Sequence, residues 1–377
     1  MINPCSFFDL LSRTGLTFYA GVPDSLLKDF CAYVADNSPA EKNIIAANEG
    51  NAVALAAGYH LATGKIGVVY LQNSGLGNCI NPLTSLTDQE VNSIPLLLLL
   101  GWRGEPGKKD EPQHLKMGRV MLDILKSIEI PYRVLPSTMS EAEKCIEEAM
   151  AYLKKNNAPY AVVVKADTFE SHNLQKKQQT NFPLDREKVL RAIIPLLGEK
   201  DIVVSTTGKT SRKLFELRAE FHQGHEKDFL TVGCMGHASS LALGIALQDP
   251  SRSVYCIDGD GAMIMHMGSF AIIGKTQPPN FKHIVINNFA HDSVGGQPTA
   301  ADHINIPQIA VGNGYKAAFS AHTKEEVSEA MEKIKKNVGP VLLEIQCHQG
   351  ARDNLGRPTR TPIENKQDFM RFLQKQT

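Results

Sequence analysis

Short apolar runs alternate with longer amphipathic or alanine-rich stretches along the whole chain. In the first half these runs predict strands at Thr17–Ala20, Asn43–Ala46, Gly67–Leu71, Pro95–Leu100, Arg133–Leu135 and Ala161–Lys165. In the second half they predict strands at Ile202–Ser205, Phe229–Val232, Val254–Ile257, His283–Ile286, Ala317–Ser320 and Val341–Ile345. The stretches between them predict helices, for example at Ser25–Asn37, Gly50–Thr63 and Ser140–Lys155. Such alternation is typical of parallel sheets covered by helices, so we expect an α/β protein.

A polar stretch from Ser171 to Pro183 separates the two series of strands and predicts a linker. We therefore expect two doubly wound parallel-sheet domains, over residues 1–170 and 185–377, joined by a linker at 171–184 with no middle domain. The likeness of the two halves is architectural, because we find no convincing repeat at the level of residues.

Composition narrows the classes of function. Lys and Arg together number 40, as do Asp and Glu, so the basic excess that nucleic-acid binding usually needs is absent. The longest apolar run, Ile94 to Gly101, is far shorter than the roughly 18 residues of a membrane helix, and the first residues do not resemble a signal peptide. The 7 cysteines are scattered without a CxxC pair, which favours reduced thiols in a cytoplasmic enzyme.

The most specific motif lies in the second half of the chain. The predicted strand Val254–Ile257 runs into Asp258-Gly259-Asp260-Gly261, and the following strand ends in Asn287-Asn288. Ligands of open parallel sheets bind beyond the carboxyl ends of the strands, where Asp260 and Asn288 both fall. A carboxylate and an amide oxygen are hard ligands that suit Mg²⁺. Either piece alone could be only a turn, but at strand ends one helix apart the pair indicates a metal site.

The glycines around this motif suit a phosphate group. Gly259 and Gly261 allow the backbone to approach a ligand closely. The amides of Gly261 and Ala262 begin the next helix, whose N-terminus favours an anion. A P-loop is a different way to bind phosphate, but the GKT at Gly208 lacks the required earlier glycine because Val203 occupies that position.

GDG followed 25 residues later by NN resembles the signature of thiamine-diphosphate enzymes. The resemblance implies that the side chains of Asp260 and Asn288 bind Mg²⁺, with the backbone carbonyl of Ala290 as the third protein ligand. It also implies that Thr207 and Gly208 belong to the first loop around the diphosphate.

The resemblance extends to the residues that would hold the cofactor rings. Glu49 stands between a strand and an alanine-rich helix, where an acid is also common without any function. In the family a glutamate at this place bonds the aminopyrimidine and promotes its imino form. Asn73 begins a glycine-rich loop of the kind found near the cofactor. Gly233 would accept a hydrogen bond from the aminopyrimidine, and Met235 would hold the two rings bent.

Short two-domain members of this family resemble the chain at Ala20–Ser25, Asp110–His114 and His291–Thr299. These members are phosphonopyruvate and sulfopyruvate decarboxylases. Sulfopyruvate decarboxylase is often divided into two subunits, whereas this chain is fused. The resemblance therefore favours decarboxylation of phosphonopyruvate to phosphonoacetaldehyde and CO₂, with sulfopyruvate or another 2-oxo acid as the alternative substrate.

In such a reaction the cofactor carries the carbon chemistry, while the protein moves protons and binds the anionic tail. His114 and His291 are candidates for the proton transfers, and each could also be a loop histidine without a role. Candidates for contact with the substrate are Asp24, Ser25, Arg352, Arg357 and Arg360, with Lys209 and Arg212 as further possibilities. Arginine suits a phosphonate because its planar fork donates two parallel hydrogen bonds.

Two other classes of protein fit the sequence less well. A dinucleotide-binding oxidoreductase would need GxGxxG after a strand and an acid about 20 residues later, and no such run occurs. A non-catalytic binding module would leave Asp260, Asn288 and Glu49 unexplained. The family resemblance further implies a homo-oligomer, at least a dimer, with active sites between subunits.

Overall fold

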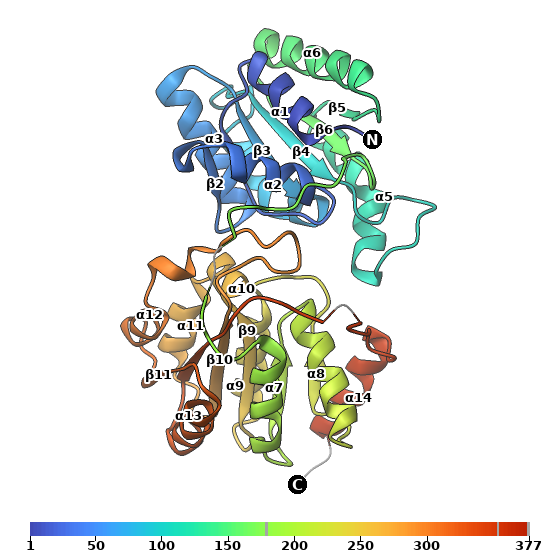
Figure 1. Cartoon of the computed structure of the whole chain (residues 1–377). Coiled ribbons are helices and arrows are strands. Elements are labelled where there is room, and N and C mark those ends of the chain that lie inside the picture. The colour runs from blue at the N-terminus through green and yellow to red at the C-terminus, as the bar shows by residue number, and fades with distance from the viewer. Residues whose placement is uncertain (178–179, 353, 375–377) are drawn as a thin grey trace. The chain divides into compact units, whose positions relative to one another are not determined.

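A computed structural model describes residues 1–177, 180–352 and 354–374 of the chain. It divides into two compact units. The first unit consists of Met1–Lys177 and Ser293–Gln297, and the second of Gln178–Asp292 and Pro298–Thr377. Each unit contains one six-stranded sheet with helices against it (Figure 1).

The sheet of the first unit has the order β2-β1-β3-β4-β6-β5, and every pairing is parallel. Its strands are β1 (Tyr19–Gly21), β2 (Asn43–Ile45), β3 (Gly67–Gln72), β4 (Leu96–Gly101), β5 (Tyr132–Val134) and β6 (Tyr160–Val164). Its helices are α1 (Pro4–Arg13), α2 (Lys28–Asn37), α3 (Glu49–Thr63), α4 (Leu76–Ser85), α5 (Pro112–Ser127) and α6 (Met139–Asn156), with short 3₁₀ turns η1 (Ala40–Lys42) and η2 (Asn73–Gly75).

Strand β4 explains why this sheet is covered on both faces. Its five consecutive leucines are fully buried, and alternate side chains of a strand point to opposite faces. Leu97 and Leu99 pack in the core formed with α1, α2 and α6, whereas Leu96, Leu98 and Leu100 pack in the core formed with α3, α4 and α5. The run therefore supplies both hydrophobic cores of the first unit.

The sheet of the second unit repeats this topology. Its order is β11-β12-β10-β9-β7-β8, so its six strands, taken in chain order, occupy the same places as β1 to β6 in the first sheet. The strands are β7 (Ile202–Ser205), β8 (Asp228–Leu230), β9 (Val254–Gly259), β10 (Phe281–Asn287), β11 (Ala317–Ala321) and β12 (Val341–Gln346).

Helices of the second unit cover both faces of its sheet. They are α7 (Arg186–Ile193), α8 (Lys209–Glu220), α9 (Ala238–Gln248), α10 (Asp260–Met265), α11 (Ser269–Thr276), α12 (Ile306–Gly312), α13 (Lys324–Lys336) and α14 (Pro362–Gln374), with 3₁₀ turns η3 (Ile194–Leu196) and η4 (Ala300–His303). One core contains side chains of α7, α8 and α13, and the other contains side chains of α9, α11 and α12.

The predicted α/β fold with two parallel sheets and no middle domain is confirmed, and each of the twelve predicted strands is present with small shifts at its ends. Part of the predicted linker is held against the first unit by hydrogen bonds. His172 and Gln175 donate backbone hydrogen bonds to Asp29 and Asp36 of α2, so this part of the segment is bound to the first unit. Gln178 and Gln179, also within the predicted linker, lie outside the described residues.

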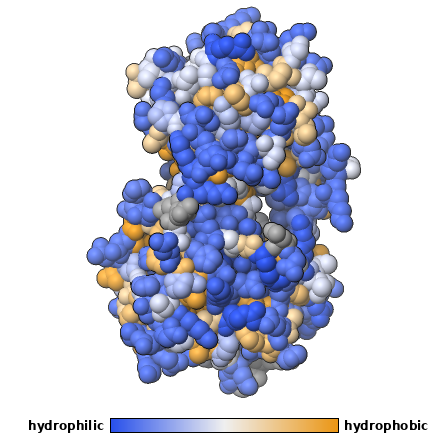
Figure 2. Space-filling model, viewed as in Figure 1, coloured by the Kyte–Doolittle hydropathy of each residue, from blue (hydrophilic) through white to orange (hydrophobic). Residues whose placement is uncertain are grey.

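None of the helices in the described part of the chain combines the length and the apolar character needed to cross a membrane. The visible face is mostly hydrophilic, with hydrophobic side chains in small scattered groups (Figure 2). This distribution agrees with apolar residues being gathered in the four cores.

Candidate active site

The loop after β9 places a buried carboxylate at the carboxyl edge of the second sheet. Asp260 is the first residue of α10, is only 3% exposed, and accepts a hydrogen bond from the hydroxyl of Thr299. Burial raises the pKa of Asp260 to about 6, partly offset by the Thr299 bond and by the nearby charge of Arg186. A cation beside a buried carboxylate of this kind would offset the free-energy cost of burying its charge.

The loop after β10 brings two more oxygen atoms to Asp260. One end of the Asn288 side-chain amide lies 3.0 Å from the carbonyl oxygen of Ala290 and 3.2 Å from Oδ1 of Asp260. The other end of the amide lies 2.8 Å from a guanidinium nitrogen of Arg186. With nitrogen at the first end, the amide makes ordinary hydrogen bonds with all three residues. With oxygen there, the amide oxygen lies about 3 Å from each of the other two oxygens, which is the spacing of adjacent ligands in an octahedral Mg²⁺ site with bonds of about 2.1 Å. The residues therefore fit such an ion.

The backbone of this loop is held in an unusual shape. Phe289, between the two oxygen donors, has φ of 60°, a left-handed conformation that is uncommon for a bulky residue. Asn287 stabilises the turn because its side-chain oxygen accepts a hydrogen bond from the Phe289 amide, while its side-chain nitrogen donates to buried Glu344 on β12. Sequence analysis did not identify Glu344 or Arg186, because neither belongs to a local motif.

The loop after β7 lies in the same unit and carries the predicted diphosphate residues. Gly208 has φ of 87°, a conformation that glycine adopts readily, and it precedes α8. The hydroxyl of Thr207 accepts a 2.8 Å hydrogen bond from the amide of Gly233 after β8, so these two loops are joined. Lys209 donates to Asp292 at 3.3 Å.

The loop that contains Met235 turns sharply. Gly233, Cys234 and Gly236 all have positive φ, at 67°, 53° and 84°. Met235 is half-buried in this loop, which follows β8. A flexible apolar side chain held on a tight loop suits a contact with a flat ring.

In the first unit, Glu49 begins α3 and is 6% exposed. Its Oε2 accepts a 2.7 Å hydrogen bond from the side chain of Asn78 on α4. Gly75, in the glycine-rich loop after β3, lies so close that any side chain there would overlap the Glu49 carboxyl. The glycine of this loop thus makes room for the glutamate.

A second polar group in the first unit collects around Arg103, which sequence analysis did not identify. Its guanidinium makes a paired contact with Asp110 and donates to the Ser25 hydroxyl at 2.8 Å. Its backbone N–H and C=O are both bonded to the side chain of Asn73. The loops after β1, β3 and β4 therefore meet at this arginine.

Asp24 and His114 belong to the same neighbourhood. Asp24 is fully buried and accepts hydrogen bonds from Gln72 and from the backbone of Leu26 and Leu27. Burial raises the pKa of Asp24. Burial, together with the charge of Arg103, lowers the pKa of His114 to about 4, so this histidine is neutral near pH 7.

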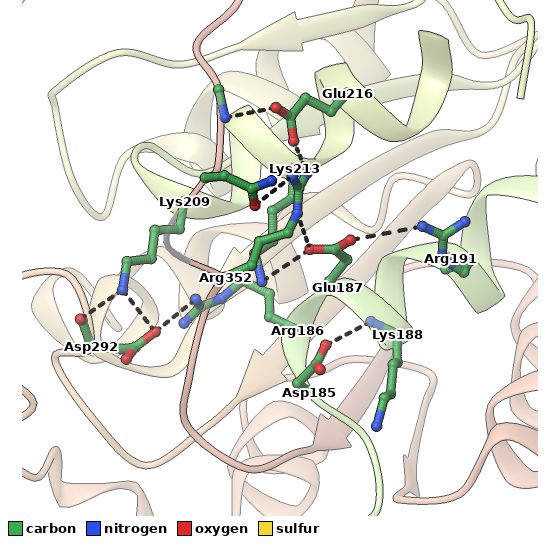
Figure 3. Close-up of polar contacts among 12 residues, drawn as sticks. Asp185, Arg186, Glu187, Lys188, Arg191, Lys209, Lys213, Glu216, Asp292 and Arg352 are labelled. Atoms are coloured by element: carbon green, nitrogen blue, oxygen red, sulfur yellow. Dashed lines mark hydrogen bonds and ion pairs between the residues drawn. The ribbon is translucent and has the colours of Figure 1, made fainter. Parts of the chain in front are cut away.

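The remaining predicted residues lie in the second unit. His291 packs against Gly261, whose missing Cβ would stand 3.1 Å from the imidazole. The predicted arginines do not gather at one point: Arg352 pairs with Glu187 and Glu216 (Figure 3), while Arg360 lies 3.8 Å from Asp368. Arg357 is exposed, and Arg212 donates to the Gly356 carbonyl.

Family models match both halves of the chain. The N-terminal thiamine pyrophosphate-binding domain of thiamine pyrophosphate enzymes matches residues 6–126, and the C-terminal one matches residues 207–345. Phosphonopyruvate decarboxylase of Streptomyces viridochromogenes is 34% identical, covering 99% of this chain and 95% of the relative. The protein of that name from Streptomyces hygroscopicus is 33% identical, covering 99% and 94%.

Two further similarities are more distant. Sulfopyruvate decarboxylase of Methanosarcina acetivorans is 29% identical, covering 89% of both chains. The crystal structure of benzoylformate decarboxylase from Polynucleobacter necessarius covers 93% of this chain and 99% of that chain at 13% identity and a TM-score of 0.39, which is too low to add to the argument. The relatives that match end to end decide the assignment: the chain belongs to the phosphonopyruvate decarboxylase family of thiamine-diphosphate-dependent 2-oxo acid decarboxylases.

Proposed function

We propose that this protein decarboxylates phosphonopyruvate to phosphonoacetaldehyde and CO₂ with thiamine diphosphate and Mg²⁺. The observation that carries the substrate is the end-to-end match to two proteins named for it. The fused chain alone does not separate the two substrates, because the sulfopyruvate decarboxylase of Methanosarcina acetivorans also matches across both halves. The higher identity to the phosphonopyruvate enzymes, 34% against 29%, favours phosphonopyruvate.

The ligands for Mg²⁺ would be Asp260, the side-chain oxygen of Asn288 and the carbonyl oxygen of Ala290. The spacing of about 3 Å from the Asn288 amide to each of the other two oxygens and the burial of Asp260 support this assignment. Magnesium keeps its other positions for phosphate oxygens and water, which suits the glycines beside Asp260. Gly259 has open space where a side chain would stand, so a phosphate could approach its backbone.

When bound, thiamine diphosphate supplies the nucleophilic carbon and accepts the electrons released with CO₂. The protein's own groups would bind, orient and move protons. Glu49 would share a proton with the aminopyrimidine, and Asn78 fixes one of its oxygens so that the other can face the ring. Thr207 and Gly208 would line the diphosphate, with Gly233 and Met235 on the pyrimidine side.

His114 is the better supported of the two histidines for proton transfer to the product. Its Nδ1 is buried without a hydrogen-bond partner among the described residues. Burial lowers the pKa of both histidines to about 4, so their pKa values do not distinguish them. Asp24 and Ser25 remain candidates for contact with the substrate. Arg103, bonded to Ser25, joins them as a positively charged candidate for the tail.

We also propose that the protein is a homo-oligomer with active sites between subunits. Helices α3 and α9 each follow the second strand of their sheet, and each exposes a stripe of small or apolar residues. On α3 the stripe is Ala54, Gly58 and Leu61, and on α9 it is Leu241, Gly244 and Leu247. A helix that is apolar all round is normally covered, so we expect a second copy to cover both stripes. The scattered cysteines favour a cytoplasmic location for this assembly.

The substrate is tested by aldehyde formation from phosphonopyruvate, sulfopyruvate and pyruvate, compared by kcat/KM. We expect phosphonopyruvate to be preferred. A higher kcat/KM for sulfopyruvate would show that the substrate assignment is wrong while leaving the cofactor chemistry intact.

The oligomer is tested by mixing two inactive proteins, Glu49→Gln and Asp260→Ala, under conditions that exchange subunits. A mixed dimer would contain one site with both changes and one with neither. Activity should therefore return to about a quarter of wild type for random pairing. No recovery despite proven subunit exchange would place each site within a single chain.

A further inference from the structure

A cavity of about 350 Å³ lies in the second unit, lined by α7, the buried face of α8 and the segment after β12. The residues that matter for its chemistry are Glu187, Lys188, Arg191, Lys213, His348 and Arg352. We call it the α7–α8 pocket.

More of the side chains that line this pocket are cationic than acidic. Figure 3 shows six cationic residues from α7, α8 and the segment after β12, namely Arg186, Lys188, Arg191, Lys209, Lys213 and Arg352. Glu187, Glu216, Glu220 and Asp292 pair with these cations, Asp260 lies near the charge of Arg186, and Asp185 accepts a hydrogen bond from the backbone amide of Lys188. Among the residues that line the pocket itself, four side chains are cationic (Lys188, Arg191, Lys213 and Arg352) and two are carboxylates (Asp185 and Glu187).

Most of the cations have a close acceptor. Arg352 donates to Glu187 at 2.9 Å and also pairs with Glu216. Arg191 makes a paired contact with Glu220 on α8. Lys188 is exposed and can be hydrated by water.

Lys213 differs from the others. Its side chain is 1% exposed, and its nearest carboxylate oxygen among the described residues is Oε2 of Glu187, at 3.7 Å. That distance is beyond a normal hydrogen bond, and the same oxygen already accepts from Arg352. Burial and the neighbouring charge of Arg186 lower the pKa of Lys213. A buried ammonium without a hydrogen-bonded acceptor is costly, which favours an anion beside it.

We propose that the α7–α8 pocket binds a small oxyanion of the phosphate class. Lys213 would donate to it from the buried wall of the pocket, and Arg352 and Lys188 from the exposed rim. A phosphate group suits these donors because it offers several acceptor oxygens and more than one negative charge. The occupant could be free phosphate or the phosphonate group of the substrate, and this part of the inference does not depend on which.

A second cavity in the same unit provides a matched control. It has a volume of about 340 Å³ and is also lined by basic residues, including Arg360 and Arg371. Their side chains are 54% and 66% exposed, so both are hydrated without a ligand. This cavity resembles the α7–α8 pocket in volume and in having arginines in its lining, but both of these arginines are exposed, unlike Lys213.

The test is titration of the holoenzyme with inorganic phosphate by calorimetry, at constant ionic strength set with chloride. We expect saturable binding, and we expect Lys213→Met to weaken it by about tenfold or more, as loss of a charge-assisted hydrogen bond would. Arg371→Gln, in the control cavity, should leave phosphate affinity unchanged. Arg352→Gln, on the exposed rim, should weaken it and serves if Lys213→Met does not fold.

Competition with substrate identifies the occupant. If the phosphonate group binds here, phosphate inhibits competitively and Lys213→Met raises KM by the same factor as it weakens phosphate binding. If free phosphate is the ligand, its affinity is the same at saturating substrate. Absence of saturable phosphate binding to wild type, or equal binding by Lys213→Met, would overturn the proposal.

Discussion

The close approach of Gly75 to Glu49 offers a way to move the proposed catalytic carboxyl without altering it chemically. Gly75 has φ of −80° and ψ of −8°, which any residue can adopt. An alanine there would therefore introduce no backbone strain. Its Cβ would, however, lie 2.6 Å from Cγ of Glu49 and closer still to the carboxyl group.

The size of the effect follows from this overlap. Ordinary contacts of a Cβ begin at 3.4 Å, so the Glu49 side chain must move by about 1 Å or leave its rotamer. A displacement of about 1 Å in a reacting group can cost on the order of 100-fold in rate. Overpacking at this position should lower the free energy of unfolding by about 1–3 kcal/mol. The reduced conformational entropy of the unfolded chain after the change from glycine to alanine should raise it by about 0.4–1 kcal/mol. Gly75→Ala should therefore be much more harmful to activation than to folding.

The assay is exchange of the thiazolium C2 proton for deuterium in the holoenzyme, together with cofactor affinity and thermal unfolding. Gly77→Ala is the control, because a Cβ at Gly77 meets nothing within 4 Å although Gly77 lies only two residues further on, in the first turn of α4. We expect exchange to be slowed about 100-fold in Gly75→Ala and unchanged in Gly77→Ala. Equal exchange in the two variants, with the cofactor bound in both, would show that the position of Glu49 does not control activation.

Three other perturbations test separate parts of the structure. Asp260→Ala should abolish cofactor retention and activity because the proposed metal site loses its only carboxylate, and full activity of wild type in excess chelator would contradict the site. The pKa of His114 falls from 6.5 to about 4 on folding, so between these pH values His114 is protonated in the unfolded chain and neutral in the folded chain. The free energy of unfolding therefore decreases as the pH falls from about 6.5 to about 4. His114→Gln should therefore show a smaller drop in its urea midpoint between pH 7 and pH 4.5, and an equal drop would exclude His114 as a source. Arg218→Met should lower the unfolding free energy by about 3–5 kcal/mol in urea melts, since it leaves Asp228 buried without its partner; a change below about 1 kcal/mol would show that the pair is not needed.

The strands and their order along the chain could be predicted because burial on both faces leaves a local pattern. The run from Leu96 to Leu100 has no polar position, since both faces of its strand pack against helices. The motif proposed to bind metal and phosphate was also visible in the sequence, because Asp260 and Asn288 follow strands whose carboxyl ends lie side by side in the sheet. Both predictions depended on short segments and on a general rule for parallel sheets.

The partners of charged side chains could not be predicted in this way. Arg103 meets Ser25, and Arg352 meets Glu187, across 78 and 165 residues of chain. Nothing in the sequence near Arg352 distinguishes an arginine held by two glutamates from one free to bind a substrate. The same is true of Lys213, which lies between two predicted strands and whose burial depends on α7 and on the segment after β12.

The physical reason is the range of the forces concerned. Hydrophobic burial acts on every residue of an element and therefore leaves a period of two or 3.6 in the sequence. A hydrogen bond or ion pair forms only between two atoms within about 3–4 Å, and the fold alone decides which distant segments come that close. The sequence by itself therefore determined the two sheets and the motif at their strand ends. The tertiary structure decided which cations are already neutralised and which, like Lys213, remain without a close acceptor among the described residues.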